Sequence, residues 1–136
     1  MKKTNKKGFT LIELLAVIAI IAIIGAIATP NVIKLITSSN QEQIISDAKL
    51  AISKAKYKFR KDMDANPNGK SYPVEDLIES DNSYVNKSTV QVSLNTDNKY
   101  TYSIYISNGK YCIGTPDEFE SEENIDKSAI SDNCSN

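Results

Sequence analysis

A single carboxylate, Glu13, lies near the start of a run of residues that is otherwise almost purely apolar. The segment from Leu14 to Ala28 has no polar side chain, and four lysines precede the run within residues 1–8. A charge carried into a bilayer costs several kcal/mol unless it is paired or drawn to the surface. Glu13 is therefore a candidate functional residue, and the chemistry it needs is a positively charged partner.

A local role for Glu13 is also open. Thr10 and Glu13 have the spacing of the S/T-x-x-E capping box, in which the two side chains satisfy backbone amides at the start of a helix. Such a cap would explain a carboxylate at a membrane surface without any partner outside the chain. It would not explain the Gly8-Phe9 pair directly upstream.

No other group of residues predicts catalysis or a metal site. The chain contains no histidine, so the commonest general base and the commonest metal ligand are both missing. The acidic run Asp117–Glu123 lacks the alternating Asp/Asn spacing and the turn glycine of a calcium loop. We expect a solvated or subunit-facing acidic patch there, and no enzymatic activity, metal or cofactor.

A basic stretch runs from Lys49 to Lys61, with six basic residues and no acid, interleaved with Tyr57 and Phe59. Phosphate binding needs clustered cations, so a contact with DNA is one interpretation. The alternatives are the solvated side of a helix, or one half of a charge match with the acidic tail of a neighbouring subunit. We do not expect a nucleic-acid partner.

Two cysteines, Cys112 and Cys134, are the only ones in the chain and are not in a CxxC arrangement. If the C-terminal part is exported, they can form one disulfide. A closed loop of about twenty-two residues would contribute roughly 3 kcal/mol in the chain-entropy model. The alternative is two unrelated free thiols.

The apolar run has the length of a membrane-spanning helix. The stretch from Leu11 to Ala28 amounts to roughly 27 Å of helix, close to the thickness of a bilayer core. Lysines precede this stretch and none follows until Lys34. This asymmetry predicts a cytoplasmic N-terminus, with the rest of the chain outside.

The octapeptide Gly8-Phe9-Thr10-Leu11-Ile12-Glu13-Leu14-Leu15 resembles the prepilin peptidase site of type IV pilins and pseudopilins. The resemblance covers roughly residues 1–60. It implies that a leader is cut after Gly8, that Phe9 becomes the N-methylated N-terminal residue, and that the apolar segment stays on the mature chain. Glu13 would then pair with the N-terminal amine of a neighbouring subunit and fix the register, because a buried ion pair is tolerable only when both charges are present.

The resemblance also implies partners and location. A type IV pilus subunit is a homo-oligomer in a helical filament, cut by prepilin peptidase and assembled by an inner-membrane platform with a cytoplasmic ATPase. Before assembly it would cross the cell membrane once, with its N-terminus in the cytoplasm. Afterwards it would lie in an extracellular pilus, for adhesion, twitching or biofilm formation.

Alternatives to a pilus subunit stay open. One is a pseudopilin of a type II secretion or competence DNA-uptake machine, although the tail closed by cysteines favours the pilus. Another starts from Ala26-Ile27-Ala28, an A-x-A-like signal-peptide site whose cleavage would release a chain starting at Thr29. That case, or an uncut signal anchor, gives a secreted or membrane-anchored binding domain with no filament role.

One long helix, residues 9 to 63, is predicted to carry these sites. Pro30 falls where many pilins have a helix-kinking proline, and it should kink a helix that continues past it; the alternative is a helix that ends at Thr29. Asn66-Pro67-Asn68-Gly69 stops the helix. An apolar stripe of period three to four, with a polar gap at residues 38–43, favours continuation: Val32, Leu35, Ile36, Ile44, Ala48, Ile52, Ala55 and Phe59.

Beyond the helix, the pattern changes to period two. Strands are predicted at residues 90–94, 100–107 and 110–114, with turns at Thr96-Asp97-Asn98 and Asn108-Gly109. A short helix over residues 74–78 precedes them. This three-stranded antiparallel meander should lie across the C-terminal half of the helix, because a sheet with one apolar face needs a cover.

The sequence therefore predicts an α+β fold of the type IV pilin kind, a long N-terminal helix on a small antiparallel sheet with a disulfide-closed C-terminal region. Residues 63–136 hold five lysines and thirteen acids, a net charge of −8. The expected parts are a leader at 1–8, a membrane and filament-core half of the helix at 9–30, an amphipathic half at 31–63, and a globular head at 64–136 with the meander at about 89–114 and a C-terminal loop.

Overall fold

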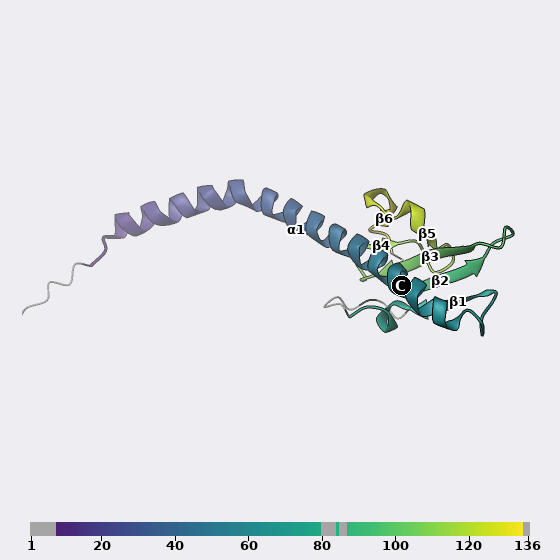
Figure 1. The fold of residues 1–136 in the computed structure, drawn as a ribbon. Helices are drawn as coiled ribbons and strands as arrows, with labels where there is room; N and C mark the ends of the chain where they lie inside the picture. The colour runs from purple at the N-terminus through teal and green to yellow at the C-terminus, as the bar shows by residue number, and fades with distance from the viewer. Residues whose placement is uncertain (1–7, 80–83, 85–86, 135–136) are drawn as a thin grey trace, which may run out of the picture. The chain divides into compact units, whose positions relative to one another are not determined.

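The computed structural model describes residues 8–79, 84 and 87–134, so residues 1–7 of the expected leader lie outside the described residues. The chain divides into two compact units, residues 1–38 and residues 39–136. One helix, α1 (Leu11–Asp62), contributes to both units (Figure 1). The predicted long helix is confirmed, and it continues through Pro30; the alternative of a helix that ends at Thr29 is wrong.

In the first unit, α1 is the only helix or strand among the described residues. Every described residue from Gly8 to Ile36 is exposed. This stretch of α1 has the length and the apolar composition of a membrane-spanning helix. The predicted stripe also included Val32, Leu35 and Ile36, but these three side chains are exposed and pack in no core. They precede the polar gap at residues 38–43, and the second unit, which holds the core, begins at residue 39.

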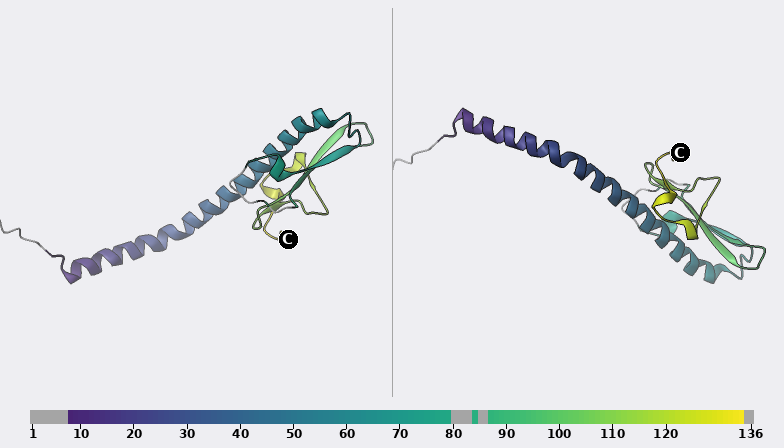
Figure 2. Two further views of the ribbon diagram at one scale, coloured as in Figure 1. Left: turned by 90° about the horizontal axis from the view of Figure 1, so that it is seen from below. Right: turned by 90° about the horizontal axis from the view of Figure 1, so that it is seen from above.

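The second unit has two layers, the C-terminal turns of α1 and one face of a sheet (Figure 2). Apolar side chains at three-to-four spacing on α1 meet apolar side chains at period two on the strands. The stripe that α1 buries is predicted correctly from Ile44 to Phe59, with Ala51 as an additional member. The core cluster also contains Tyr72, Val74, Leu77, Ile78, Val90, Val92, Ile104, Ile106, Tyr111, Ile113 and Ile125.

The sheet is antiparallel throughout, with strand order β1-β2-β3-β4-β6, and β5 pairs with β3 away from this path. Its strands are β1 (Gly69–Pro73), β2 (Thr89–Leu94), β3 (Tyr100–Ser107), β4 (Cys112–Ile113), β5 (Glu120–Ser121) and β6 (Ile130–Ser131). Three short 3-10 helices accompany them: η1 (Val74–Asp76), η2 (Glu122–Asn124) and η3 (Lys127–Ala129). The meander β2-β3-β4 lies where the alternation predicts it, and η1 lies in the predicted helix at residues 74–78.

The β2–β3 hairpin agrees with its prediction in detail. Val90 faces Ile104 across the ladder, and both side chains are fully buried. The turn is closed by Asn95, whose backbone N–H donates to the Lys99 carbonyl at 2.9 Å, and Asn98 adopts a φ of 60°. Asparagine tolerates this left-handed conformation better than most residues do.

The second hairpin forms with a longer loop than Asn108-Gly109 predicts. Only Gly109 of the pair has a positive φ, of 83°. The Asn108 side-chain oxygen accepts hydrogen bonds from the N–H groups of Lys110 and Tyr111, at 3.0 and 2.8 Å. These side-chain bonds replace a two-residue turn, so that β4 begins at Cys112 rather than at Lys110.

Strand β1 was not predicted, because its sequence has only one buried side chain, Tyr72, and ends in a proline. Its pairing with β2 is what makes it a strand. Gly69 begins it with a φ of 112°, and a Cβ at this position would lie 2.0 Å from the Val92 carbonyl oxygen. Gly69 was predicted only as part of the segment that ends the helix, but the close approach of β1 and β2 also requires a glycine there.

The C-terminal segment is part of the core layer and not a loop held by a disulfide alone. Strands β5 and β6 pair with β3 and β4, and Ile125 is buried in the core. Cys112 and Cys134 form the disulfide, with 5.6 Å between their Cα atoms, so the alternative of two free thiols is wrong. This packing could not be predicted from residues 115–134, because they are mostly polar. One buried isoleucine and two strands of two residues each are too few to give a repeating pattern of apolar side chains.

Candidate functional site

The first turn of α1 contains a complete capping box between Thr10 and Glu13. The Thr10 backbone N–H and hydroxyl both donate to Glu13 Oε2, at 2.8 and 3.0 Å, and the Glu13 N–H donates to Thr10 Oγ1 at 3.3 Å. Backbone amides at a helix start have no intrahelical partner, so these bonds stabilise the first turn. The local capping role predicted for Glu13 from the sequence is thus confirmed.

The capping box engages only one of the two carboxylate oxygens of Glu13, Oε2. Within the part of the chain that the structure describes, Glu13 Oε1 has no hydrogen-bond partner and Glu13 has no ion pair. The side chain is held at the N-terminal end of the helix by Thr10, with its second oxygen available to a donor from outside. Capping and pairing with an external cation are therefore compatible roles.

Gly8 and Phe9 lie in open surroundings ahead of the capping box. A Cβ added at Gly8 would meet nothing within 4 Å, and Gly8 does not have a positive φ. Phe9 is 91% exposed. Among the described residues nothing requires a glycine at position 8.

Pro30 interrupts the backbone ladder of the apolar segment, because it has no N–H to donate to the carbonyl four residues earlier. The polar side chains on either side bond to carbonyls of the same turn: Thr29 Oγ1 to Gly25 O at 2.5 Å, and Asn31 Nδ2 to Ile27 O at 3.5 Å. The carbonyl that loses its partner at Pro30 is that of Ala26, and the two side-chain bonds go to the carbonyls on either side of it. The sequence did not single out Thr29 and Asn31 for these bonds, although both flank the proline directly.

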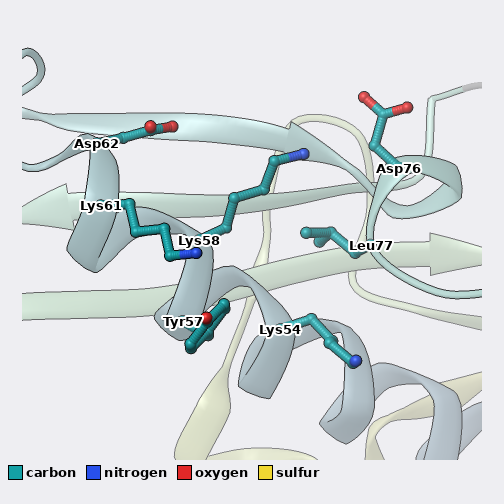
Figure 3. A pocket seen from close by; sticks show the side chains of 7 residues that line it. All are labelled: Lys54, Tyr57, Lys58, Lys61, Asp62, Asp76 and Leu77. Carbon is teal, nitrogen blue, oxygen red and sulfur yellow. The ribbon is translucent and has the colours of Figure 1, made fainter.

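The basic stretch of α1 divides into two flanks, one on each side of the buried stripe. Lys49, Lys56 and Arg60 lie on one flank. Lys54, Lys58 and Lys61 lie on the other and line a shallow pocket of about 440 Å³ together with Tyr57, Asp62, Asp76 and Leu77 (Figure 3). No three acidic or cysteine side chains come together as a metal site among the described residues.

The prokaryotic N-terminal methylation motif, as a family model, matches residues 3–29 of the chain. The match includes Gly8, Phe9 and Glu13 and most of the apolar segment, and it does not extend to the second unit. None of the curated proteins and none of the solved structures matches the chain. The resemblance inferred from the octapeptide is therefore shown for the N-terminal segment.

Proposed function

The prokaryotic N-terminal methylation motif is the signature of type IV pilins and prepilin-like proteins, and from this premise we propose that the chain is a structural subunit of a type IV pilus. In this proposal, prepilin peptidase removes residues 1–8 and the new N-terminal residue, Phe9, is N-methylated. Residues 9–30 then anchor the subunit in the membrane before assembly and form the core of the filament afterwards. Residues 31–63 carry the head, residues 64–136, to the filament surface.

The open surroundings of Gly8 are the observation that supports the processing step best. The motif contains a glycine that the described part of the fold does not need, next to an exposed phenylalanine. Recognition by a peptidase that cuts after Gly8 would explain why a glycine stands at this position. The membrane step is supported by the apolar part of α1, which is exposed along its whole length in the first unit.

The pairing step is supported by the geometry of Glu13. Cleavage before Phe9 would create a positive amine one residue before Thr10, the residue that positions the Glu13 carboxylate. A neighbouring subunit would then present its own Phe9 amine to the oxygen that Thr10 leaves unbonded. A subunit out of register would leave both charges unpaired in an apolar filament core, which is strongly disfavoured.

The choice of a pilus over a secretion or DNA-uptake pseudopilus rests on the head. The Cys112–Cys134 disulfide fastens a segment of exposed acidic residues against the sheet. Such a segment suits a filament that is exposed to the medium, where a disulfide resists unfolding of a small domain. The subunit should accordingly be recovered from sheared surface filaments as well as from membranes.

The first test is the N-terminal residue of the native protein, measured by mass spectrometry of membrane and sheared surface fractions. A chain that starts at Phe9 and is heavier by one methylene group, present in the sheared fraction, is expected. A chain that starts at Thr29 would contradict the proposal and indicate a secreted domain. A processed chain that never leaves the membrane fraction would contradict the pilus role while keeping the processing step.

A pair of variants separates the two roles of Glu13. Glu13→Gln keeps an oxygen for the capping box but removes the charge, whereas Thr10→Ala removes the two capping bonds of the Thr10 hydroxyl and keeps both the backbone bond and the charge. We expect both variants to be cut at Gly8, and only Glu13→Gln to lose surface filaments. Equal filament yields from the two variants would contradict the pairing role.

A further inference from the structure

The two basic flanks of α1 differ in what covers them. On the flank with Lys49 and Lys56, the C-terminal segment packs against the helix: Lys56 forms an ion pair with Glu122 of η2. On the same flank, farther toward the N-terminus of α1, Glu42 pairs with Lys127 of η3 at 2.8 Å. The C-terminal segment thus covers this flank through two ion pairs, of which only the one to Lys56 neutralises a basic residue of the flank; among the described residues Lys49 and Arg60 have no ion pair.

The other flank has no such cover. Its members, which we call the open basic flank, are Lys54, Tyr57, Lys58 and Lys61. Among the described residues none of these three lysines has an ion pair; Lys61 lies over the Tyr57 ring at 4.6 Å and Lys58 over the Tyr72 ring at 5.6 Å. Figure 3 shows their side chains on the turns of α1 that face the pocket.

Two acids border the same pocket. Asp62 is already engaged, since its Oδ2 accepts hydrogen bonds from Lys70 Nζ at 2.9 Å and from the Tyr72 hydroxyl at 3.1 Å. Asp76 lies in η1, beyond Lys58 in Figure 3, and forms no ion pair among the described residues. The open basic flank therefore keeps a positive surplus, beside an exposed tyrosine ring that can add apolar contact area.

The acidic segment has a matching surplus. Glu122 is used by Lys56, but within residues 8–79, 84 and 87–134 the carboxylates of Asp117, Glu118, Glu120 and Glu123 have no ion pair and no side-chain hydrogen bond. Asp117, Glu118 and Glu123 are exposed. We call these four residues the open acidic segment.

We propose that the open basic flank of one subunit binds the open acidic segment of a second copy of the chain. Within one chain, the acidic segment covers the opposite flank of α1, so it cannot reach both. The two surfaces differ from each other, so the contact is heterologous and leaves one unused surface of each kind at the ends. Contacts of this type propagate into open helical filaments when the rotation does not close; the inference rests on the proposed filament and names the head surfaces that meet in it.

Charge-swap variants of the full-length chain test the pairing in an assembling cell. Lys54→Glu with Lys61→Glu, and separately Glu118→Lys with Glu123→Lys, should each lower the yield of sheared filaments about tenfold, because like charges then face each other. The four substitutions together restore opposite charges and should restore the yield. Lys110→Glu makes the same kind of charge change at an exposed position outside both surfaces and should leave the yield unchanged.

Cross-linking of the unmodified chain gives a second measurement that does not depend on filaments. A carbodiimide joins a lysine amine to a carboxylate as an amide with loss of water, and a mixture of ¹⁵N-labelled and unlabelled chains in membranes identifies links between copies. We expect mixed-label peptides that join Lys54 or Lys61 to Glu118 or Glu123.

The outcomes separate this inference from the proposed function. If wild-type filaments form and the swapped doubles assemble normally, or the quadruple variant is not rescued, the inference is wrong and the filament proposal stands. If the wild-type chain forms no filaments, the pilus proposal fails. In that case mixed-label links still support the contact between copies, and their absence overturns it.

Discussion

Phe9 and Phe59 lie just before the start and near the end of the same helix, yet one is 91% exposed and the other is fully buried. Burial of such a side chain is worth roughly 1.5–3 kcal/mol. Phe59 gains this within its own chain, where its ring meets Tyr100 edge-on with 4.8 Å between centroids. Phe9 gains none of it from the described residues of its own chain.

This contrast extends to the two units as wholes. In the second unit, contacts within the chain explain the residue types at key positions. Gly69 is needed because two strands approach closely there, and the apolar stripe on α1 is needed because it is buried against the sheet. In the first unit, no contact among the described residues explains the residue types of Gly8, Phe9 or the exposed apolar side chains. Substitutions in the first unit should therefore change processing and assembly without changing the stability of the head, whereas substitutions in the buried core of the second unit should change that stability without changing cleavage at Gly8.

The largest effect is expected at Gly8. A Cβ at position 8 meets nothing within 4 Å, so a bulky Gly8→Phe change should leave the fold of the head intact, and in the proposed function it should block removal of the leader completely. Intact mass in the membrane fraction measures this directly. Gly25→Ala is the matched control, since a Cβ there also meets nothing within 4 Å. Efficient cleavage of the Gly8→Phe chain would mean that position 8 has no external requirement.

The next effect is expected in the core. Phe59→Ala should lower the free energy of unfolding by about 3–5 kcal/mol, whereas Ile20→Ala, at an exposed position of the first unit, should not change it. All seven tyrosines of the chain lie in the second unit, so their near-ultraviolet circular dichroism reports on that unit alone. Denaturation of the full chain in detergent measures both variants. An equal loss from Ile20→Ala would show that the two units are not independent.

The disulfide should have a smaller effect than the core. Removing it with Cys112→Ala and Cys134→Ala should cost roughly 3 kcal/mol, because the reduced chain regains the entropy of the closed loop. The head should keep its fold, since β5, β6 and Ile125 also hold the C-terminal segment. Cleavage at Gly8 should be unaffected. Loss of all tyrosine dichroism in this variant would show that the disulfide alone holds the segment.

The elements predicted from the sequence are those whose signal is local. The helix, its buried stripe from Ile44 to Phe59 and the β2–β3 hairpin follow from periods of 3.6 and 2 with marked turns. Strands β1, β5 and β6 exist only because a partner strand lies beside them, and their own residues show little alternation. Pairing between distant segments leaves no such local period.

The features of the candidate site also fall into two groups, those that a local sequence motif predicts and those that depend on the fold. The octapeptide predicts Gly8, Phe9 and Glu13, because the processing enzyme that we propose would read a short linear segment. The free oxygen on Glu13 and the difference between the two basic flanks depend on three-dimensional contacts, those of Thr10 and of the C-terminal segment. The basic stretch in the sequence gives no sign that one flank is covered and the other is open.

The smallest effect is expected where α1 meets β1. The Lys70 ammonium and the Tyr72 hydroxyl hold the pKa of Asp62 below its ordinary value, and burial together with the bond to Asp62 raises the pKa of Tyr72 to about 12. A carboxylate with a lowered pKa stabilises the fold above its unfolded pKa of about 4, and this contribution is lost as the pH falls through the folded value. Asp62→Asn should therefore be slightly less stable than the wild type at pH 7 and equally stable in strong acid. Asp64→Asn, at an exposed position without a described partner, should match the wild type at pH 7. A deficit of Asp62→Asn that persists undiminished in acid would mean that Asp62 acts through packing and not through its charge.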